Sequence, residues 1–428
     1  MTLAVLIGVF LILLALGVPV VWALAGATLS VLATGLMPLP PAWFAQEVFR
    51  GANTISLVSI PLFLLAGGLM NEGGLTRRIV NVADDFLGWM RGGLGLVNVG
   101  TCMVYGGISG SATADTGAVA SIMIPAMSER GYPKAYAAAV TAASGTLGII
   151  IPPSVIMIMY GVVTGTSIGG LFVAGIVPGI LVAVVFMATA GIIGVRNGFP
   201  KSAHQFSVRR LVRNTVLAAP AILMPVVVLG SILTGFATVT EAAFVGVVWA
   251  TLVAAAVYRE LTWARMWKVS VETLQLTGAI MIIMALATPF SWILTVEQVP
   301  AMAAGFLVEY VSSGTITILL ILALLLFVGL WLDTGPALII LAPIIHPIGI
   351  EAGLGPYQLG LIFTVALGIG LFTPPVGTNI FVVCSIAKLS LWPVSRWLVP
   401  FWIASVICLI VVAFVPSITE YIPTVFGY

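Results

Sequence analysis

Charged residues are scarce in this chain of 428 residues. Lys+Arg number 16 and Asp+Glu 14, together 7% of the chain, whereas 61% of the residues are hydrophobic. A soluble domain carries about 25% charged residues, so the composition excludes a soluble globular protein and a soluble enzyme held by a single anchor. The long unbroken apolar runs also exclude a transmembrane barrel, whose strands are short and alternate. We therefore expect an all-α polytopic membrane protein.

Cysteine is equally scarce. Cys102, Cys384 and Cys408 lie far apart inside apolar stretches, and no CxxC or Cys/His cluster occurs. This spacing excludes a disulfide framework and a zinc site. The absence of an HExxH motif excludes a zinc protease. The cysteines are expected to be small packing residues.

Long apolar runs dominate what is present. A membrane-spanning helix needs about 20 apolar residues, and candidate runs lie near residues 3–17, 19–36, 55–72, 135–163, 167–195, 212–232, 238–258, 269–294, 357–387 and 396–418. Two further regions, 93–128 and 313–347, are too long for one span. Each is broken by a polar tip, SGSATADTG at 109–117 and LDTGP at 332–336. We expect both to be re-entrant hairpins, which enter and leave the membrane on the same side.

The basic residues favour one orientation. Cytoplasmic loops of membrane proteins are enriched in Lys and Arg. With the N-terminus outside, 15 of the 16 basic residues fall in inside loops, leaving only Arg50 outside. The first run lacks the basic region of a cleaved signal peptide, so we interpret it as the first span. These observations predict a multi-pass membrane protein whose N- and C-termini lie outside.

The chain divides into two similar halves. We expect a first repeat over residues 1–195, a cytoplasmic linker over 196–213 and a second repeat over 214–428. Each repeat would hold five spans, one hairpin and one interrupted helix. Because five crossings is an odd number, the second repeat must have inverted topology.

Two motifs support the duplication. Asp115-Thr116-Gly117 is followed by Pro125, and Asp333-Thr334-Gly335 is followed by Pro343 at the same interval. Downstream, GIIIPPS at 148–154 matches GLFTPPV at 370–376. Two features in matching order indicate an inverted repeat.

The Pro-Pro pairs interrupt two spans. Proline lacks an N–H and clashes with the preceding helical turn, and Pro152-Pro153 and Pro374-Pro375 fall inside runs 135–163 and 357–387. The unwound backbone leaves free carbonyls at mid-membrane depth, which are tolerated only inside protein or beside a water-filled cavity. Paired broken helices in inverted halves indicate the binding site of a secondary transporter.

Oxygen atoms near the tips and breaks suit a sodium ion, and half-helix N-termini, each with about +0.5 charge, suit an anion. No Lys or Arg lies within the interrupted spans. The candidate substrate-binding residues are Ser111, Thr113, Thr116, Ser154, Thr334, Thr378 and Asn379. Two alternatives stay open: Asp115 and Asp333 as helix N-caps, and the proline pairs as mere kinks.

At these motifs the chain resembles a known family. GGISGSATADTGAVASIMIPAM, ASGTLGIIIPPS and GLFTPPVGTNIF are similar to the large membrane subunit of tripartite ATP-independent periplasmic (TRAP) transporters. The resemblance implies a sodium-coupled importer of organic anions, such as C4-dicarboxylates or sugar acids, that works as an elevator. It implies two partners, a small four-helix membrane subunit and a periplasmic substrate-binding protein. It also implies a bacterial or archaeal inner membrane, in which the outside N- and C-termini would be periplasmic. It further implies sodium ligands at Ser109, Asp115, Gly148, Ile151 and Pro153, and at Asp333, Gly370, Thr373 and Pro375.

The resemblance also bears on two segments outside the motifs. Some members of the family fuse the two membrane subunits, whereas this chain starts at the large one, so a separate small subunit is expected. The amphipathic stretch 73–91 resembles a horizontal arm helix that braces a scaffold, and a solvated loop helix is the alternative.

Two other functions remain as alternatives. A stand-alone sodium/dicarboxylate symporter would have a similar fold and need no periplasmic partner. An intramembrane protease is a remote alternative, because Gly107-Ile108-Ser109-Gly110 fits a GxSG serine protease pattern with His346 as a candidate base. Short motifs of this kind are common in glycine-rich chains, and we expect no enzyme.

Overall fold

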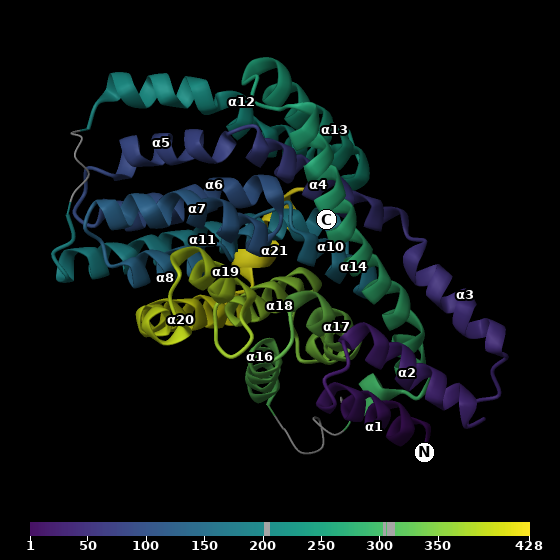
Figure 1. Cartoon of the computed structure of the whole chain (residues 1–428). Coiled ribbons are helices and arrows are strands. Elements are labelled where there is room, and N and C mark those ends of the chain that lie inside the picture. The colour runs from purple at the N-terminus through teal and green to yellow at the C-terminus, as the bar shows by residue number, and fades with distance from the viewer. Residues whose placement is uncertain (201–205, 303–304, 306–312) are drawn as a thin grey trace.

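The computed structural model describes residues 1–200, 206–302, 305 and 313–428, and within them every regular element is helical. Part of the predicted linker 196–213 lies outside the described residues. Figure 1 shows long helices stacked in layers, with one long helix, α14 (Trp263–Val296), crossing their ends. The protein is an all-α polytopic membrane protein, as the composition predicts.

Fewer helices are long enough to span the membrane than the ten runs predict. Among the described residues seven qualify, or eight if one bent pair forms a single span. Besides α14 these are η1 with α4 (Ile55–Glu72), α11 (Ile168–Arg196), α12 (Val208–Leu233), α13 with η2 (Val239–Val257), α17 (Thr334–Glu351) and α20 (Leu391–Phe414).

The first two runs account for part of this difference. They form α1 (Thr2–Ala15) and α2 (Val20–Ala33), which have 14 residues each. At 1.5 Å per residue each is about 21 Å long, short of the hydrocarbon core of about 30 Å. Gly17 and Gly35 follow them with φ values of +78° and +65°. Such a φ stops a right-handed helix, so α1 and α2 end early and pack against each other.

Three helices lie outside the predicted spans. Two, α3 (Pro41–Ala52) and α21 (Ser417–Val425), were not expected, although Pro41 stands at a helix start where proline is favoured. The third, α5 (Leu75–Leu87), corresponds to the predicted arm. It packs between α12 and the helix α6 (Gly93–Ser109), and its Asp85 pairs with Arg210 of α12. It is therefore a packed helix and not a free solvated one.

Both predicted hairpins consist of two helices joined at the predicted tip. In the first half α6 is followed by α7 (Ala112–Glu129), and in the second half α16 (Gly314–Gly329) is followed by α17.

Both predicted interruptions are present. The first broken helix consists of α8 (Lys134–Ser144), α9 (Leu147–Ile150) and α10 (Val155–Thr164), with a bend of 43° at the break. The second consists of α18 (Pro356–Leu371) and α19 (Thr378–Ala387). In each case the helix stops beside the Pro-Pro pair, as the missing N–H groups require.

The two halves pack reciprocally. The first hairpin arms, α6 and α16, contact the first part of the broken helix of their own half, α8 with α9 and α18 respectively. The second arms contact the broken helices of both halves: α7 packs on α8 and α19, and α17 packs on α18 and α10. We call α6–α10 with α16–α19 the inner group. Its interior holds large fully buried side chains, among them Tyr105, Tyr136, Tyr160 and Phe363.

Candidate ion and substrate site

Asp115 is the most deeply buried acid of the inner group. It lies in the first turn of α7, fully buried, and accepts a hydrogen bond at Oδ1 from the Ser109 hydroxyl. The Ser109 oxygen in turn accepts from the backbone N–H of Ser111, at 3.2 Å. Within the described residues, Oδ2 of Asp115 has no hydrogen-bond partner. Because a buried carboxylate oxygen without a partner is strongly unfavourable, Oδ2 is suited to bind a cation.

Backbone from the broken helix approaches the same hairpin tip. A Cβ at Gly148 would overlap Oδ2 of Asp115 and lie 3.2 Å from the carbonyl oxygen of Ser111. Gly110, at the tip, has a φ of +68°, and a Cβ there would lie 2.8 Å from the carbonyl oxygen of Pro153. Glycine is therefore required at both positions, and it lets the backbone of the break reach the tip.

Ile151 is placed differently from the other predicted ligands of the first half. It stands at the end of α9, where its N–H donates to the carbonyl of Leu147 at 2.8 Å. Its side chain packs against Gly179 of α11. The structure thus brings Ser109, Asp115 and Gly148 together, with Pro153 beside the tip, and Ile151 adjoins them along the chain.

The second half repeats part of this geometry. A Cβ at Gly370 would overlap the carbonyl oxygen of Gly329, as one at Gly148 would crowd the carbonyl of Ser111. Gly329 stands four residues before Asp333, and Ser111 stands four residues before Asp115. The matching backbone contact therefore joins positions that the two DTG motifs and the two Pro-Pro motifs make equivalent.

The two aspartates differ in their surroundings. Asp333 is the N-cap residue of α17, is exposed, and accepts at its backbone oxygen from the N–H of Ala337 at 3.1 Å. Thr373, in the second break, donates its hydroxyl to the carbonyl of Ile369 at 2.5 Å, and its N–H donates to Gly370 at 3.1 Å. Pro375 lies in the same break, between α18 and α19.

A cavity of about 340 Å³ separates the two hairpin tips. One further wall is α14, which contributes four apolar side chains, and α4, α9, α10 and α18 complete the lining. The lining side chains with oxygen atoms are those of Ser111, Thr113, Asp333, Thr334 and Thr378. The α14 residues in the lining are Leu276, Ala279, Ile280 and Ile283. Four of the predicted substrate-binding residues thus line one cavity. The α14 wall was not predicted from sequence, because its apolar residues are typical of any membrane span.

Thr113 and Thr378 link the two halves at this cavity. Their hydroxyl oxygens lie 3.5 Å apart. Thr113 begins the second arm of the first hairpin, and Thr378 begins α19 in the second half. A ligand in the cavity would therefore contact both repeats.

Three predicted substrate-binding residues do not line this cavity. Thr116, Ser154 and Asn379 are fully buried. The Ser154 hydroxyl caps α10 by accepting from the N–H of Met157 at 3.4 Å, and the Asn379 amide donates to the carbonyl of Ala142 at 3.2 Å. Thr116 packs against Gly145. The Thr116 hydroxyl and the Oδ1 atom of Asn379 have no hydrogen-bond partner among the described residues. Substrate contact by these three residues stays a prediction.

The pairing required by a serine protease is missing at the predicted residues. Ser109 donates to Asp115, whereas the Nδ1 atom of His346 is hydrogen-bonded to the hydroxyl of Tyr160 at 2.7 Å. Among the described residues there is also no cluster of three or more His, Cys, Asp or Glu side chains that would hold a metal ion.

Comparison with known proteins places this geometry in a family. A family model described as "Tripartite ATP-independent periplasmic transporter, DctM component" matches residues 7–418. The chain belongs to the DctM family. It is a membrane transporter subunit and not an enzyme, which the resemblance of its motifs to TRAP large subunits predicts.

Relatives in the DctM family carry permease names. The chain is 37% identical over 383 residues to the C4-dicarboxylate TRAP transporter large permease protein DctM of Pseudomonas aeruginosa, covering 90% of each protein. It is 35% identical over 407 residues to the 2,3-diketo-L-gulonate TRAP transporter large permease protein YiaN of Escherichia coli, covering 95% of each. It is 36% identical over 417 residues to the isethionate TRAP transporter permease protein DctMQ of Oleidesulfovibrio alaskensis, covering 97% of this chain and 65% of that protein.

A solved structure shares the fold of this DctM family member. The YdaH transporter of Alcanivorax borkumensis matches with a TM-score of 0.63 and 15% sequence identity, covering 87% of this chain and 88% of that one. At this identity the likeness concerns the fold alone.

Proposed function

We propose that this chain is the permease subunit of a sodium-coupled, binding-protein-dependent importer of organic anions. The observation that carries the proposal is the buried Oδ2 of Asp115, which has no partner in the described residues. The hairpin tip just before it, residues 110–113, lines the cavity between the two tips. The relatives named for C4-dicarboxylate, 2,3-diketo-L-gulonate and isethionate support an organic anion as the substrate.

The first sodium site would lie at the tip of the first hairpin. Hard cations prefer carboxylate, carbonyl and hydroxyl oxygens, and such groups are supplied there by Ser109, Asp115, Gly148, Ile151 and Pro153. The orphaned Oδ2 of Asp115 and the close approach of Gly148 fit this role. A sodium ion would compensate the carboxylate charge, which would otherwise be buried without a partner.

A second sodium site would lie at the second break, with Asp333, Gly370, Thr373 and Pro375 as ligands. Gly370 approaches the backbone of the second hairpin as Gly148 approaches that of the first. The second site is more open, because Asp333 is exposed. We therefore propose that it binds and releases its ion more readily than the first.

The anion would bind in the cavity between the tips. Among the described residues no Lys or Arg lines this cavity, so the positive field must come from bound cations and helix ends. The helices α7 and α17 both begin at the tips, and helix N-termini favour anions. Ser111, Thr113, Thr334 and Thr378 would supply hydroxyl contacts, which the cavity lining supports.

Transport would follow an elevator mechanism. The inner group carries the proposed ion sites and most of the cavity lining, whereas α14, with Leu64 of α4, supplies the opposite wall. Sliding of the inner group along the apolar face of α14 breaks no hydrogen bond between the cavity-lining side chains of these two parts, because those of α14 are apolar. A periplasmic binding protein and a small four-helix membrane subunit are the proposed partners, and the periplasmic location of both termini is part of the proposal.

Uptake in proteoliposomes tests the proposal. Vesicles would contain this chain and a small membrane subunit from the same source, with labelled succinate, isethionate and sialic acid offered separately. We expect uptake of at least one anion that needs both an inward sodium gradient and the binding protein. Sodium-driven uptake without the binding protein would favour the stand-alone symporter. Equal uptake in potassium and sodium would refute sodium coupling.

A further inference from the structure

Next to the cavity between the tips lies a second cavity that contains a positive charge. It has a volume of about 370 Å³ and is lined by residues of α3, α14, α10 and α17. Ile283 of α14 lines the first cavity and the next residue, Met284, lines the second. On α17 the lining likewise continues, from Pro336 to Ile339. The two cavities are therefore neighbours along the same seam between α14 and the inner group.

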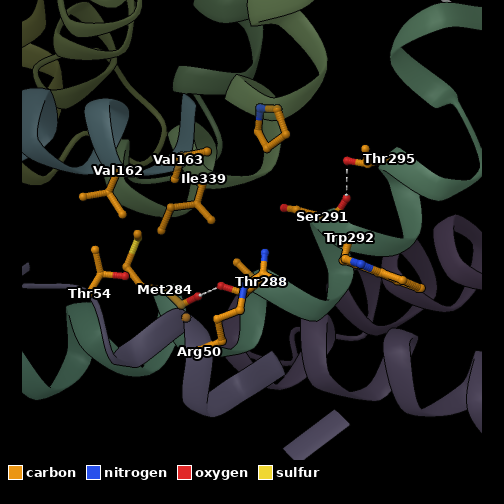
Figure 2. A pocket seen from close by; sticks show the side chains of 13 residues that line it. Arg50, Thr54, Val162, Val163, Met284, Thr288, Ser291, Trp292, Thr295 and Ile339 are labelled. Atoms are coloured by element: carbon orange, nitrogen blue, oxygen red, sulfur yellow. Dashed lines mark hydrogen bonds between the residues drawn. The ribbon is translucent and has the colours of Figure 1, made fainter. Parts of the chain in front are cut away.

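Arg50 provides the charge. It comes from the last turn of α3, and its side chain is 70% exposed. Figure 2 shows it reaching past Thr288 into the space below Val163 and Ile339. Its contact with Glu47, a single N–H donated over 3.4 Å, leaves most of the five guanidinium donors available. An arginine held this way is suited to grip a carboxylate or sulfonate with two parallel hydrogen bonds.

Four hydroxyl-bearing residues line the same cavity as Arg50. Thr288, Ser291 and Thr295 follow one face of α14, and Thr54 faces them from the segment after α3. The Thr288 and Thr295 hydroxyls donate to carbonyls of their own helix at 2.9 Å. In the part of the chain that the structure describes, the Ser291 hydroxyl has no hydrogen bond and so remains a donor for a ligand.

The Arg50 cavity leads on to a wider one. A third cavity of about 520 Å³ shares Val163, Thr295 and Pro343 with it and extends to Glu351 at the end of α17. In the proposed orientation Glu351 lies at the periplasmic side. The three cavities thus follow one another along α14. The Arg50 cavity lies between the cavity that reaches Glu351 and the cavity between the tips.

We propose that Arg50 with Ser291 forms an outer binding station, which holds the carboxylate or sulfonate group of the substrate before it reaches the cavity between the hairpin tips. The proposal rests on the proposed function. It explains why Arg50 stands outside the positively charged cytoplasmic loops. In the cavity between the tips, the positive charge would come from the coupling cations, because no described Lys or Arg lines it. The outer station would supply a fixed positive charge that attracts the anion before it reaches this cavity.

Substitution of Arg50 tests the station. The probe is whichever of succinate, isethionate or sialic acid the wild-type assembly takes up best. We expect Arg50→Gln to raise the KM for this anion about tenfold, because a charge-assisted pair is lost, with the maximal rate within about twofold. Arg50→Lys should recover only part of the affinity, since lysine lacks the planar fork. Arg209→Gln, which removes an exposed charge at the start of α12, is the matched control and should leave KM unchanged.

The competing role for Arg50 is to neutralise Glu47, whose carboxylate is largely buried. The double variant Glu47→Gln/Arg50→Gln separates the two roles. If neutralisation is the function, the double variant regains the wild-type KM and the proposal is overturned. If the station exists, the double variant keeps the raised KM. Ser291→Ala, a small change with little risk to folding, should raise KM about twofold to threefold.

Two further outcomes separate this inference from the proposed function. Wild-type vesicles that take up none of the three anions would refute the proposed function and this inference with it. Wild-type uptake with an unchanged KM in Arg50→Gln would refute the station alone. The station would also be refuted if Arg50→Gln altered only the concentration of binding protein needed for half-maximal uptake. Arg50 would then contact the binding protein and not the substrate.

Discussion

The hydroxyl of Tyr160 lies 2.7 Å from Nδ1 of His346. Tyr160 belongs to α10 of the first half of the chain and His346 to α17 of the second, so this hydrogen bond joins the two halves. The Tyr160 ring also packs on Phe363 of α18, at a centroid distance of 5.4 Å. The pair thus fastens the second hairpin to the first broken helix and helps the inner group to behave as one body.

Loss of this hydrogen bond should weaken the inner group. Tyr160→Phe keeps the ring packing and removes the hydroxyl, which leaves His346 without its partner. We expect the free energy of unfolding to fall by about 1 kcal/mol and the thermal midpoint in detergent to drop accordingly. Tyr421→Phe, at a residue that is 67% exposed, is the control. An equal midpoint in both variants would mean that the bond contributes nothing to stability.

Asp115 should be essential for sodium-driven uptake. Asp115→Ala removes the carboxylate proposed to bind sodium, and we expect uptake to fall to background while the protein still inserts and purifies. The Ser109 hydroxyl loses its acceptor as well, so Asp115→Asn is a milder second variant with the same expected loss. Full activity in either variant would remove Asp115 from the proposed site.

Gly148 should also be needed for sodium binding, because it lies against the Asp115 carboxylate. A Cβ there would overlap Oδ2 of Asp115, whereas one at Gly278 of α14 meets no atom within 4 Å. We therefore expect Gly148→Ala to lower sodium affinity at least about tenfold. Gly278→Ala is the control, expected to keep activity and to gain up to about 1 kcal/mol of stability from helix propensity. Similar sodium titrations for the two variants would contradict the proposed ion site.

The first proline pair should keep the helix between α9 and α10 interrupted. Replacing both Pro152 and Pro153 with Ala restores two N–H donors and removes two ring clashes, so a continuous helix becomes favourable. The carbonyls of the break would then be used within the helix, and we expect weaker sodium dependence of uptake. Sodium dependence like that of the wild type would reduce the pair to a structural kink.

Local sequence features predicted much of the architecture. The apolar runs, the DTG tips and the proline pairs predicted the hairpin tips and both helix breaks, because proline and polar tips act on the backbone within a few residues. The lengths of the first two helices were predicted less well. Composition counts apolar residues, whereas Gly17 and Gly35 adopt positive φ values and end the helices early.

The candidate site was also only partly predictable from the sequence. The amino-acid sequence by itself determined the membrane class, the duplicated motifs and the aspartates, since these follow from composition and local order. Only the tertiary structure decided that Thr113 and Thr378 meet across the repeats, that Thr116, Ser154 and Asn379 are buried in packing, and that α14 closes the cavity. These outcomes depend on which helices pack against each other in the folded protein. An apolar run does not specify its packing partner, because any apolar helix face can pack against it.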